Sequence, residues 1–199
     1  MISDPCIDLV PRLQRRKQST INRVVDSTPR CPLCTMNPPI QVYLSEMKAH
    51  ACRFPPESDF VQCIQQAAAQ TGSTALCFLT CVGSLSQLTL RMANASAANK
   101  DSCYRTWEEN LEIVSVTGTI ACTEADGRCK FHIHVAVADA TGSVFGGHLV
   151  SGTVHTTAEV VLGSLPQARF DRVQDPSTGF RELSIHSQGG IGATDANKR

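Results

Sequence analysis

The sequence predicts an α+β fold, in which an antiparallel or mixed β-sheet of about seven strands packs against one main helix. Three observations support this prediction. Apolar residues recur every three to four positions in one clear stretch, residues 58–71, which is the period of a helix. Several other stretches alternate apolar and polar residues or are continuously apolar, as strands are. Short turns separate many of these stretches, and such hairpin order favours antiparallel pairing.

The helix is expected to run from Ser58 to about Thr71. Ser58 or Asp59 can cap its first turn, because both side chains accept hydrogen bonds from free backbone N–H groups. Gly72 supplies the stop, since glycine is favoured just beyond a helix C-terminus. Before the helix, residues 50–54 alternate in the manner of a strand.

The first long strand is expected at residues 75–82, where the run is almost continuously apolar. Such a run is typical of a strand buried on both faces. Gly83 and Ser84 are expected to turn the chain into the next strand, residues 88–92. Residues 111–120 are again rich in residues that favour strands.

The second half of the chain is predicted to be nearly all strand. Residues 130–138 and 143–145 form a hairpin through the turn at Asp139–Gly142, because Asp and Gly are favoured in such turns. A long strand is expected at residues 152–162 and a last short one at residues 180–185.

The 199 residues suit one folded domain with tails rather than two domains. Prolines interrupt the chain up to residue 39, so residues 1–39 are expected to be a basic, flexible tail. The domain is expected at residues 40–185, followed by a polar, Gly-rich tail at 186–199. No apolar run is long enough for a membrane span and no segment resembles a secretory signal. The chain is therefore expected to be intracellular, either cytoplasmic or nuclear.

The net charge of zero combines a basic tail with an acidic domain. Residues 1–30 carry a net charge of +3, whereas residues 40–185 carry −4. The N-terminal basic cluster consists of Arg12, Arg15, Arg16 and Lys17. Such a cluster occurs in nuclear-localisation or nucleic-acid-binding segments, and more often in solvated tails without a partner. DNA affinity comes largely from Lys and Arg near phosphates, so a contact with DNA or chromatin would rely on this tail.

Two histidines carry the clearest sign of chemistry. On a strand, His132 and His134 share one face with about 7 Å between their Cα atoms, a spacing at which two imidazoles can bind one metal ion. His148, which follows Gly146 and Gly147, lies on the far side of the hairpin. Three histidines with an open fourth position are typical of catalytic zinc sites, although imidazole also suits iron, nickel and copper. The alternative is three ordinary sheet histidines that are exposed or hydrogen-bonded.

Three further residues are candidates for roles around these histidines. His155 and Glu159 fall on one face of the following strand, where they could supply another ligand or orient the ligands. Arg91, a charged residue within a strand pattern, could hold an anion near the metal.

The ten cysteines are a weaker clue than the histidines. Cys31–Cys34 is a Cys-x-x-Cys motif in a proline-rich segment, and as half of a zinc site it would need two more ligands. His50 and Cys52 are candidates for these ligands. The other cysteines, Cys122 and Cys129 included, show no regular framework, and without a secretory signal reduced thiols are expected.

Several blocks of the sequence, in the same order, resemble the PPC domain family (plants and prokaryotes conserved). The blocks are Phe78–Arg91, Glu112–Thr119, His132–His134, Asp139–Gly142, Gly146–Leu149 and Thr157–Val160. The resemblance covers about residues 40–185. It implies a domain with an antiparallel sheet and one packed helix, and it implies a homotrimer.

The resemblance also bears on metal and DNA. The His-x-His and Gly-Gly-His motifs resemble the prokaryotic type of the domain, in which these histidines can hold a metal, and this implies the same role for His132, His134 and His148. Plant members usually join the domain to an AT-hook with an Arg-Gly-Arg-Pro core. That tetrapeptide is absent from this sequence, so the AT-hook function is not implied.

Two functional hypotheses follow. The first is a homotrimeric, metal-binding regulatory or binding module, with zinc as the expected metal, which contacts DNA or chromatin through its tail. The alternative is a metal-dependent enzyme, in which the same histidines hold a metal that activates water. Glu159 is the candidate general base of that enzyme.

Overall fold

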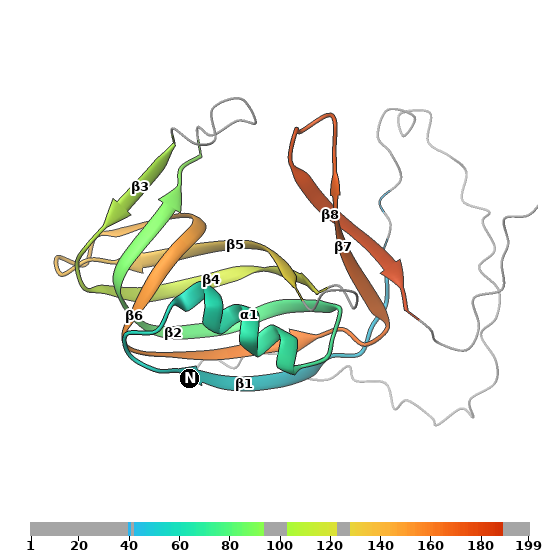
Figure 1. Cartoon of the computed structure of the whole chain (residues 1–199), viewed down its shortest axis with the longest axis horizontal. Helices are drawn as coiled ribbons and strands as arrows, with labels where there is room; N and C mark the ends of the chain where they lie inside the picture. The colour runs from blue at the N-terminus through green and yellow to red at the C-terminus, as the bar shows by residue number, and fades with distance from the viewer. Residues whose placement is uncertain (1–39, 41, 94–102, 123–127, 189–199) are drawn as a thin grey trace, which may run out of the picture. The chain divides into compact units, whose positions relative to one another are not determined.

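The structure is a computed structural model that describes residues 40, 42–93, 103–122 and 128–188. Contacts divide the chain into two units, residues 1–40 and 41–199, and every element described below belongs to the second. The described residues form one helix and eight strands, which are labelled in Figure 1. They are β1 (Lys48–Phe54), α1 (Phe60–Gln70), β2 (Ala75–Arg91), β3 (Tyr104–Trp107), β4 (Leu111–Cys122), β5 (Cys129–Ala138), β6 (Val144–Ser164), β7 (Ala168–Gln174) and β8 (Arg181–Ser187).

Six strands form an antiparallel sheet in the order β1-β6-β5-β4-β2-β3. β6 also pairs with β2, so it has β1, β5 and β2 as partners at different places along its length. Through this additional pairing, β2, β4, β5 and β6 form a closed circle of hydrogen-bonded neighbours. The predicted α+β class with an antiparallel sheet is confirmed, although the sheets dominate and there are eight strands rather than about seven.

Two of the predicted strand boundaries are wrong. Gly83 was expected in a turn, but it lies inside β2, a continuous strand of 17 residues. Its φ is 142°, and a Cβ atom there would lie 2.0 Å from the backbone oxygen of Thr157 on β6. The pairing with β6 shifts register just after Gly83, so the glycine permits a bulge and a close approach of two backbones. The strands expected at residues 143–145 and 152–162 likewise prove to be one strand of 21 residues, β6, which begins at Val144.

The helix begins two residues later than the earliest expected start. Asp59 is its N-cap and accepts a hydrogen bond from the backbone N–H of Gln62. Phe60, Ile64 and Ala68 recur at four-residue spacing and are completely buried. Figure 1 shows α1 lying across one face of the main sheet, which explains why this single apolar stripe is sufficient for packing.

The sheet face away from this core is partly open in the single chain. Residues 75–82 were expected to be buried on both faces, but Leu79 and Val82 are 45% and 51% exposed. Leu76, Phe78 and Cys81 of the same strand are buried. The prediction failed because the described elements of the chain cover only one side of β2.

β7 and β8 form a separate two-stranded antiparallel sheet. Ala168 and Phe170 of β7 pack with Ala75 and Ala121 in a small second core. β7 also carries Arg172, a buried residue whose guanidinium donates a 2.5 Å hydrogen bond to Oγ1 of Thr119 on β4. This hairpin is therefore held against the end of the main sheet.

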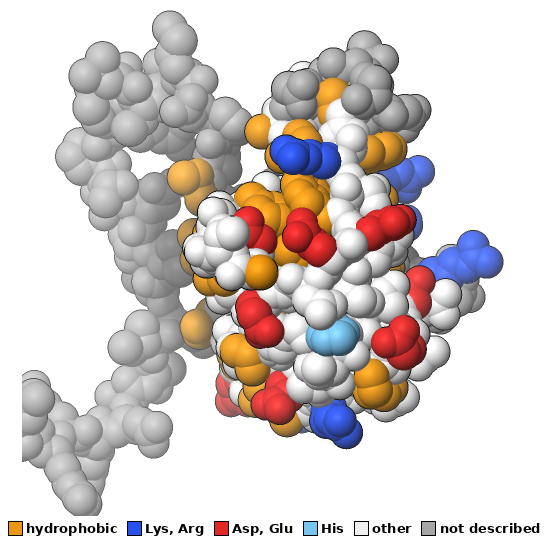
Figure 2. All heavy atoms as spheres, turned by 90° about the vertical axis from the view of Figure 1, so that its left-hand side faces the viewer, with side chains coloured by type: hydrophobic (Ala, Val, Ile, Leu, Met, Phe, Trp, Pro, Cys, Tyr) orange, Lys and Arg blue, Asp and Glu red, His pale blue; other side chains and the backbone are white. Residues whose placement is uncertain are grey.

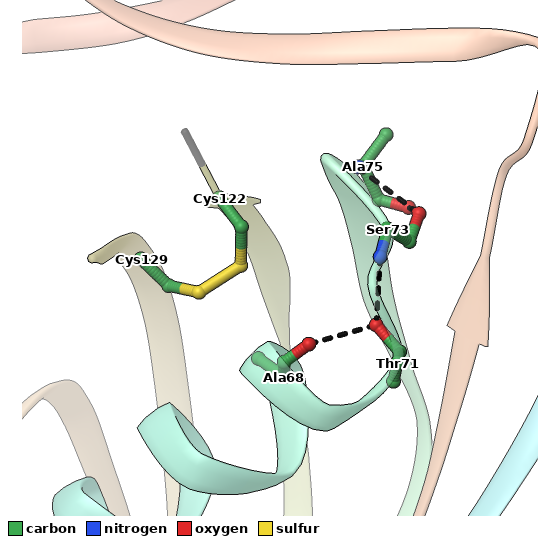
Figure 3. Close-up of a disulfide and its surroundings, with 6 residues drawn as sticks. All are labelled: Ala68, Thr71, Ser73, Ala75, Cys122 and Cys129. Atoms are coloured by element: carbon green, nitrogen blue, oxygen red, sulfur yellow. Dashed lines mark hydrogen bonds between the residues drawn. A yellow bond between two sulfur atoms is a disulfide. The ribbon is translucent and has the colours of Figure 1, made fainter. Parts of the chain in front are cut away.

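Cys122 and Cys129 form a disulfide, contrary to the expectation of reduced thiols. They are directly opposite each other in the register of β4 and β5, which brings their side chains to one side at bonding distance. Figure 3 shows the disulfide joining the ends of these two strands. Spacing along the sequence could not reveal this, because the pairing depends on the register of the hairpin.

Several predictions concern residues outside the described part of the chain. They are those for the N-terminal basic cluster and for Cys31 and Cys34. No helix among the described residues has the length and apolar character needed to cross a membrane.

Candidate metal centre

Three histidines from two neighbouring strands converge at one end of the sheet. His132 and His134 lie on β5, and His148 lies on β6 directly opposite His134. The three ring centroids are 5.1 to 5.5 Å apart. One ring nitrogen from each histidine lies within 4.8 Å of the others. We call His132, His134 and His148 the histidine triad.

The local sequence explains why β6 reaches this position. At His148, β6 pairs with β5 on one side and with Arg91 of β2 on the other. A Cβ atom on Gly146 would lie 2.5 Å from the backbone oxygen of Val135, and one on Gly147 would lie 3.0 Å from that of Arg91. The glycine pair therefore permits a close approach to both neighbours, which places His148 beside the other two histidines.

The ring nitrogens are arranged as metal ligands would be. The Nε2 atoms of His132 and His134 face each other at 3.2 Å. Nδ1 of His148 is buried and has no hydrogen-bond partner among the described residues, which is an unusual state for a buried polar atom. A divalent cation would satisfy such a set of imidazole nitrogens, so the residues fit the metal that the sequence predicts.

The surroundings favour the uncharged form of the histidines, which is the form that binds metal. Burial, followed by the positive charge of Arg91, lowers the pKa of His148 to about 4. Partial desolvation, followed by the charge of Arg172, lowers the pKa of His132. At neutral pH both rings are therefore available as neutral ligands.

A small pocket of about 250 Å³ opens beside the histidine triad. His132, His148 and Arg91 line it, and the guanidinium carbon of Arg91 lies 5.2 Å from the ring centre of Phe180. The remaining lining residues are Phe131, Arg181 and Glu182. The pocket thus combines potential metal ligands, aromatic walls and charged side chains.

The structure separates the other predicted site residues. Arg91 lies beside the histidine triad, as the anion-contact hypothesis requires. Glu159 pairs with Arg53 of β1 and Val82 of β2, near the opposite end of β6, and lines a different, apolar pocket. His155 lies between them along β6 and is not among the residues that line the pocket beside the triad. Glu159 lies eleven positions beyond His148 on the extended strand, so we assign Glu159 no role as a general base at the triad.

Sequence reasoning missed the residues that β7 and β8 contribute. Arg172 is close enough to act electrostatically on His132 and His148, and Phe180, Arg181 and Glu182 line the pocket. An alternating pattern around residues 168–174 could have indicated a strand. No local signal, however, shows that the hairpin returns to the histidines.

Comparison with known proteins identifies the family. A family model described as the Plants and Prokaryotes Conserved (PCC) domain matches residues 41–166. The chain therefore belongs to this family, which is the one that the sequence motifs resembled under the abbreviation PPC.

Two curated relatives and one solved structure illustrate this similarity. The bifunctional protein GlmU of a Synechococcus strain is 39% identical over 145 residues, which are 72% of this chain and 21% of that protein. The AT-hook motif nuclear-localized protein 8 of Arabidopsis thaliana is 30% identical over 101 residues, 49% of this chain and 25% of that protein. The chain thus matches about a fifth to a quarter of these relatives. A metal-containing protein from Archaeoglobus fulgidus is 25% identical with a TM-score of 0.61, covering 73% of this chain and 99% of that one.

Proposed function

We propose that this domain binds one divalent metal ion through the histidine triad and that zinc is the metal. The convergence of three ring nitrogens within 4.8 Å carries the proposal. The similarity to a metal-containing protein adds support. Three imidazoles leave a coordination position free, and the adjacent pocket would give a ligand access to it.

Metal analysis of the purified full chain tests this proposal. We expect about one zinc ion per chain in the wild type and little or none in His132→Ala. His155→Ala is the matched control, because it removes a histidine of β6 that lies outside the triad. A wild-type protein that neither contains nor takes up a divalent metal would overturn the proposal, as would equal loss in the control.

A second candidate function is metal-dependent catalysis on a small molecule. The pocket beside the histidine triad favours it, since a purely structural metal site is usually closed to ligands. When bound, zinc could act as a Lewis acid or lower the pKa of a bound water. Turnover of a candidate substrate that disappears in His132→Ala but persists in His155→Ala would support catalysis.

We further propose that the open sheet face is the interface of a homotrimer. Met47, Leu79 and Val82 expose 45% to 52% of their surface there. The side chains of Met47 and Leu79 both lie beside Gly163, and Val82 lines a neighbouring apolar pocket. A second copy of this chain is the occupant that would bury such a patch. Val82→Glu should convert the trimer to monomers in light scattering, whereas a monomeric wild type would contradict the proposal.

We propose that any contact with DNA uses the N-terminal basic cluster and not the folded domain. Figure 2 shows acidic side chains spread across one end of the domain, with basic ones mostly toward its edges, and such a surface repels phosphates. Binding of the full chain to a DNA duplex should fall when Arg15 and Arg16 are both changed to Ala. If that variant bound DNA as tightly as the wild type, and with the same dependence on salt, the proposal would be overturned.

A further inference from the structure

The pocket beside the histidine triad is walled by residues from two parts of the fold. The triad and Arg91 belong to β5, β6 and β2, inside the region matched by the family model. Arg181 and Glu182 lie at the start of β8 and Phe180 directly precedes it, all beyond residue 166, where that match ends. The β7–β8 hairpin therefore adds a wall to a site that the common domain provides.

Two contacts fix the hairpin in this position. Arg172 of β7 donates hydrogen bonds to the hydroxyl and the carbonyl oxygen of Thr119 on β4. The guanidinium of Arg91 lies over the ring of Phe180 at 5.2 Å, at the distance of a cation–π contact. The wall is thus attached both to the strand beside β5 and to the pocket's own arginine.

The charges around the pocket are unbalanced. Arg91 and Arg181 line it, whereas Glu182 is the single acidic residue among its described lining residues. Arg172 of β7 is only 7% exposed. Its Nε group has no hydrogen-bond partner in the described part of the chain. A divalent metal on the triad would add two further positive charges. An anion is therefore the ligand that this environment stabilises.

The volume and the lining residues of the pocket limit the size and the polarity of the ligand that it can bind. Its volume of about 250 Å³ is below the roughly 300–1,000 Å³ of pockets for drug-sized ligands. Phe131 and Phe180 supply apolar surface beside the arginines. A small molecule with one anionic group and a short apolar part suits both features.

We propose that the β7–β8 hairpin makes this pocket a binding site for a small organic anion, a carboxylate or a phosphate monoester, held by Arg91 and Arg181. Arginine suits such a ligand because its planar guanidinium can donate two hydrogen bonds to one oxyanion. The apolar part of the ligand packs against Phe180. This inference rests on the proposed metal site, since the same histidines form one side of the pocket.

Calorimetric titration of the zinc-loaded full chain tests the proposal. Butyrate and butyl phosphate are the probes, and butyramide is an uncharged control of similar shape to butyrate. We expect one or both anions to bind and butyramide not to bind. The stronger of the two anions identifies the anionic group that the site prefers.

Arginine variants are decisive, because an open zinc ion alone would attract a carboxylate. Arg181→Gln changes an exposed side chain, so it should preserve the fold. Arg91→Lys keeps the positive charge but removes the planar guanidinium group. Each should weaken anion binding about tenfold or more, the effect expected when a charge-assisted hydrogen bond is lost. Arg169→Gln, on the same hairpin but paired with Asp171 away from the pocket lining, should bind as the wild type does.

The two proposals fail in different ways. A wild-type chain that takes up no metal overturns the proposed function. A chain that holds zinc but binds neither anion, or binds butyramide as tightly as butyrate, overturns the inference alone. Wild-type affinity in Arg181→Gln, or an equal loss in Arg169→Gln, also overturns it.

Discussion

Replacing Gly146 with alanine should loosen the sheet at the point where the histidine triad forms. The added Cβ atom would lie 2.5 Å from the backbone oxygen of Val135 and 3.1 Å from Cα of Ala136. Both are backbone atoms of β5, so no side-chain rotation relieves the contact. β5 and β6 must therefore separate, two residues from the pair formed by His134 and His148.

The magnitude follows from two opposing effects. Overpacking typically costs about 1–3 kcal/mol, whereas removing a glycine restricts the unfolded chain and returns about 0.4–1 kcal/mol. A net loss of about 1–2 kcal/mol corresponds to a fall in Tm of about 2–8 °C for a chain of this size. Zinc affinity should fall too, because the ligands on β5 and β6 move apart.

Calorimetric melting of the metal-free protein and zinc titration of the folded protein measure the two effects. Gly152→Ala is the matched control on β6, because its Cβ would lie 3.2 Å from the oxygen of Gln87 and outside the triad. The control should lower Tm less and leave zinc affinity unchanged. A Gly146→Ala protein that melts at the wild-type temperature or above would refute the reasoning.

Three other predictions use separate features. Gly83→Ala should lower Tm more than Gly146→Ala does, because its Cβ would lie 2.0 Å from a backbone oxygen; a smaller effect would contradict the close-approach argument. His148 has a folded-state pKa of about 4, below its ordinary value of about 6.5. Between these pH values this histidine gains a proton only in the unfolded chain, which favours unfolding. The free energy of unfolding of the metal-free protein, measured by urea denaturation, should therefore fall as the pH falls. The fall should be smaller in His148→Gln. Replacing Cys122 and Cys129 with Ser should cost about 2 kcal/mol, whereas an unchanged denaturation midpoint under oxidising conditions would argue against the disulfide.

The position of the triad could be predicted because local rules determine it. His132 and His134 share a face because strand side chains alternate. The turn at Asp139–Gly142 is closed by a hydrogen bond from the backbone N–H of Asp139 to the oxygen of Ser143. This turn sets the register that brings His148 opposite His134. A short hairpin thus carries all three histidines.

The errors arose where distant backbone decides the conformation. Gly83 and Ser84 have the composition of a turn, yet the reason for a glycine at position 83 is the oxygen of Thr157 on another strand. Leu79 and Val82 look like core residues in sequence, but burial on their side requires a surface that the described chain does not supply. Such partners have no fixed spacing in the sequence.

The pocket was the least predictable part. Arg181 stands 33 positions beyond His148 in the chain and follows no motif that links the two. Its place beside the triad depends on how β7 packs through Ala168 and Phe170. Sequence reasoning therefore found the candidate metal ligands but not the residues that would select what binds beside them.

The 21 residues of β6 pair with three strands, of which β5 is its hairpin neighbour and β1 and β2 are distant in sequence. Sheets dominated by such non-local pairings fold slowly, because chain closure must precede the contacts that reward it. His132, His134 and His148 are near one another as soon as the β5–β6 hairpin forms, whereas His148 and Arg91 meet only when β6 has closed against β2. Zinc bound to the triad would therefore stabilise a local contact, and contacts that form before the slow closure mainly govern the folding rate. The metal is expected to act chiefly by speeding folding, with less effect on the rate of unfolding.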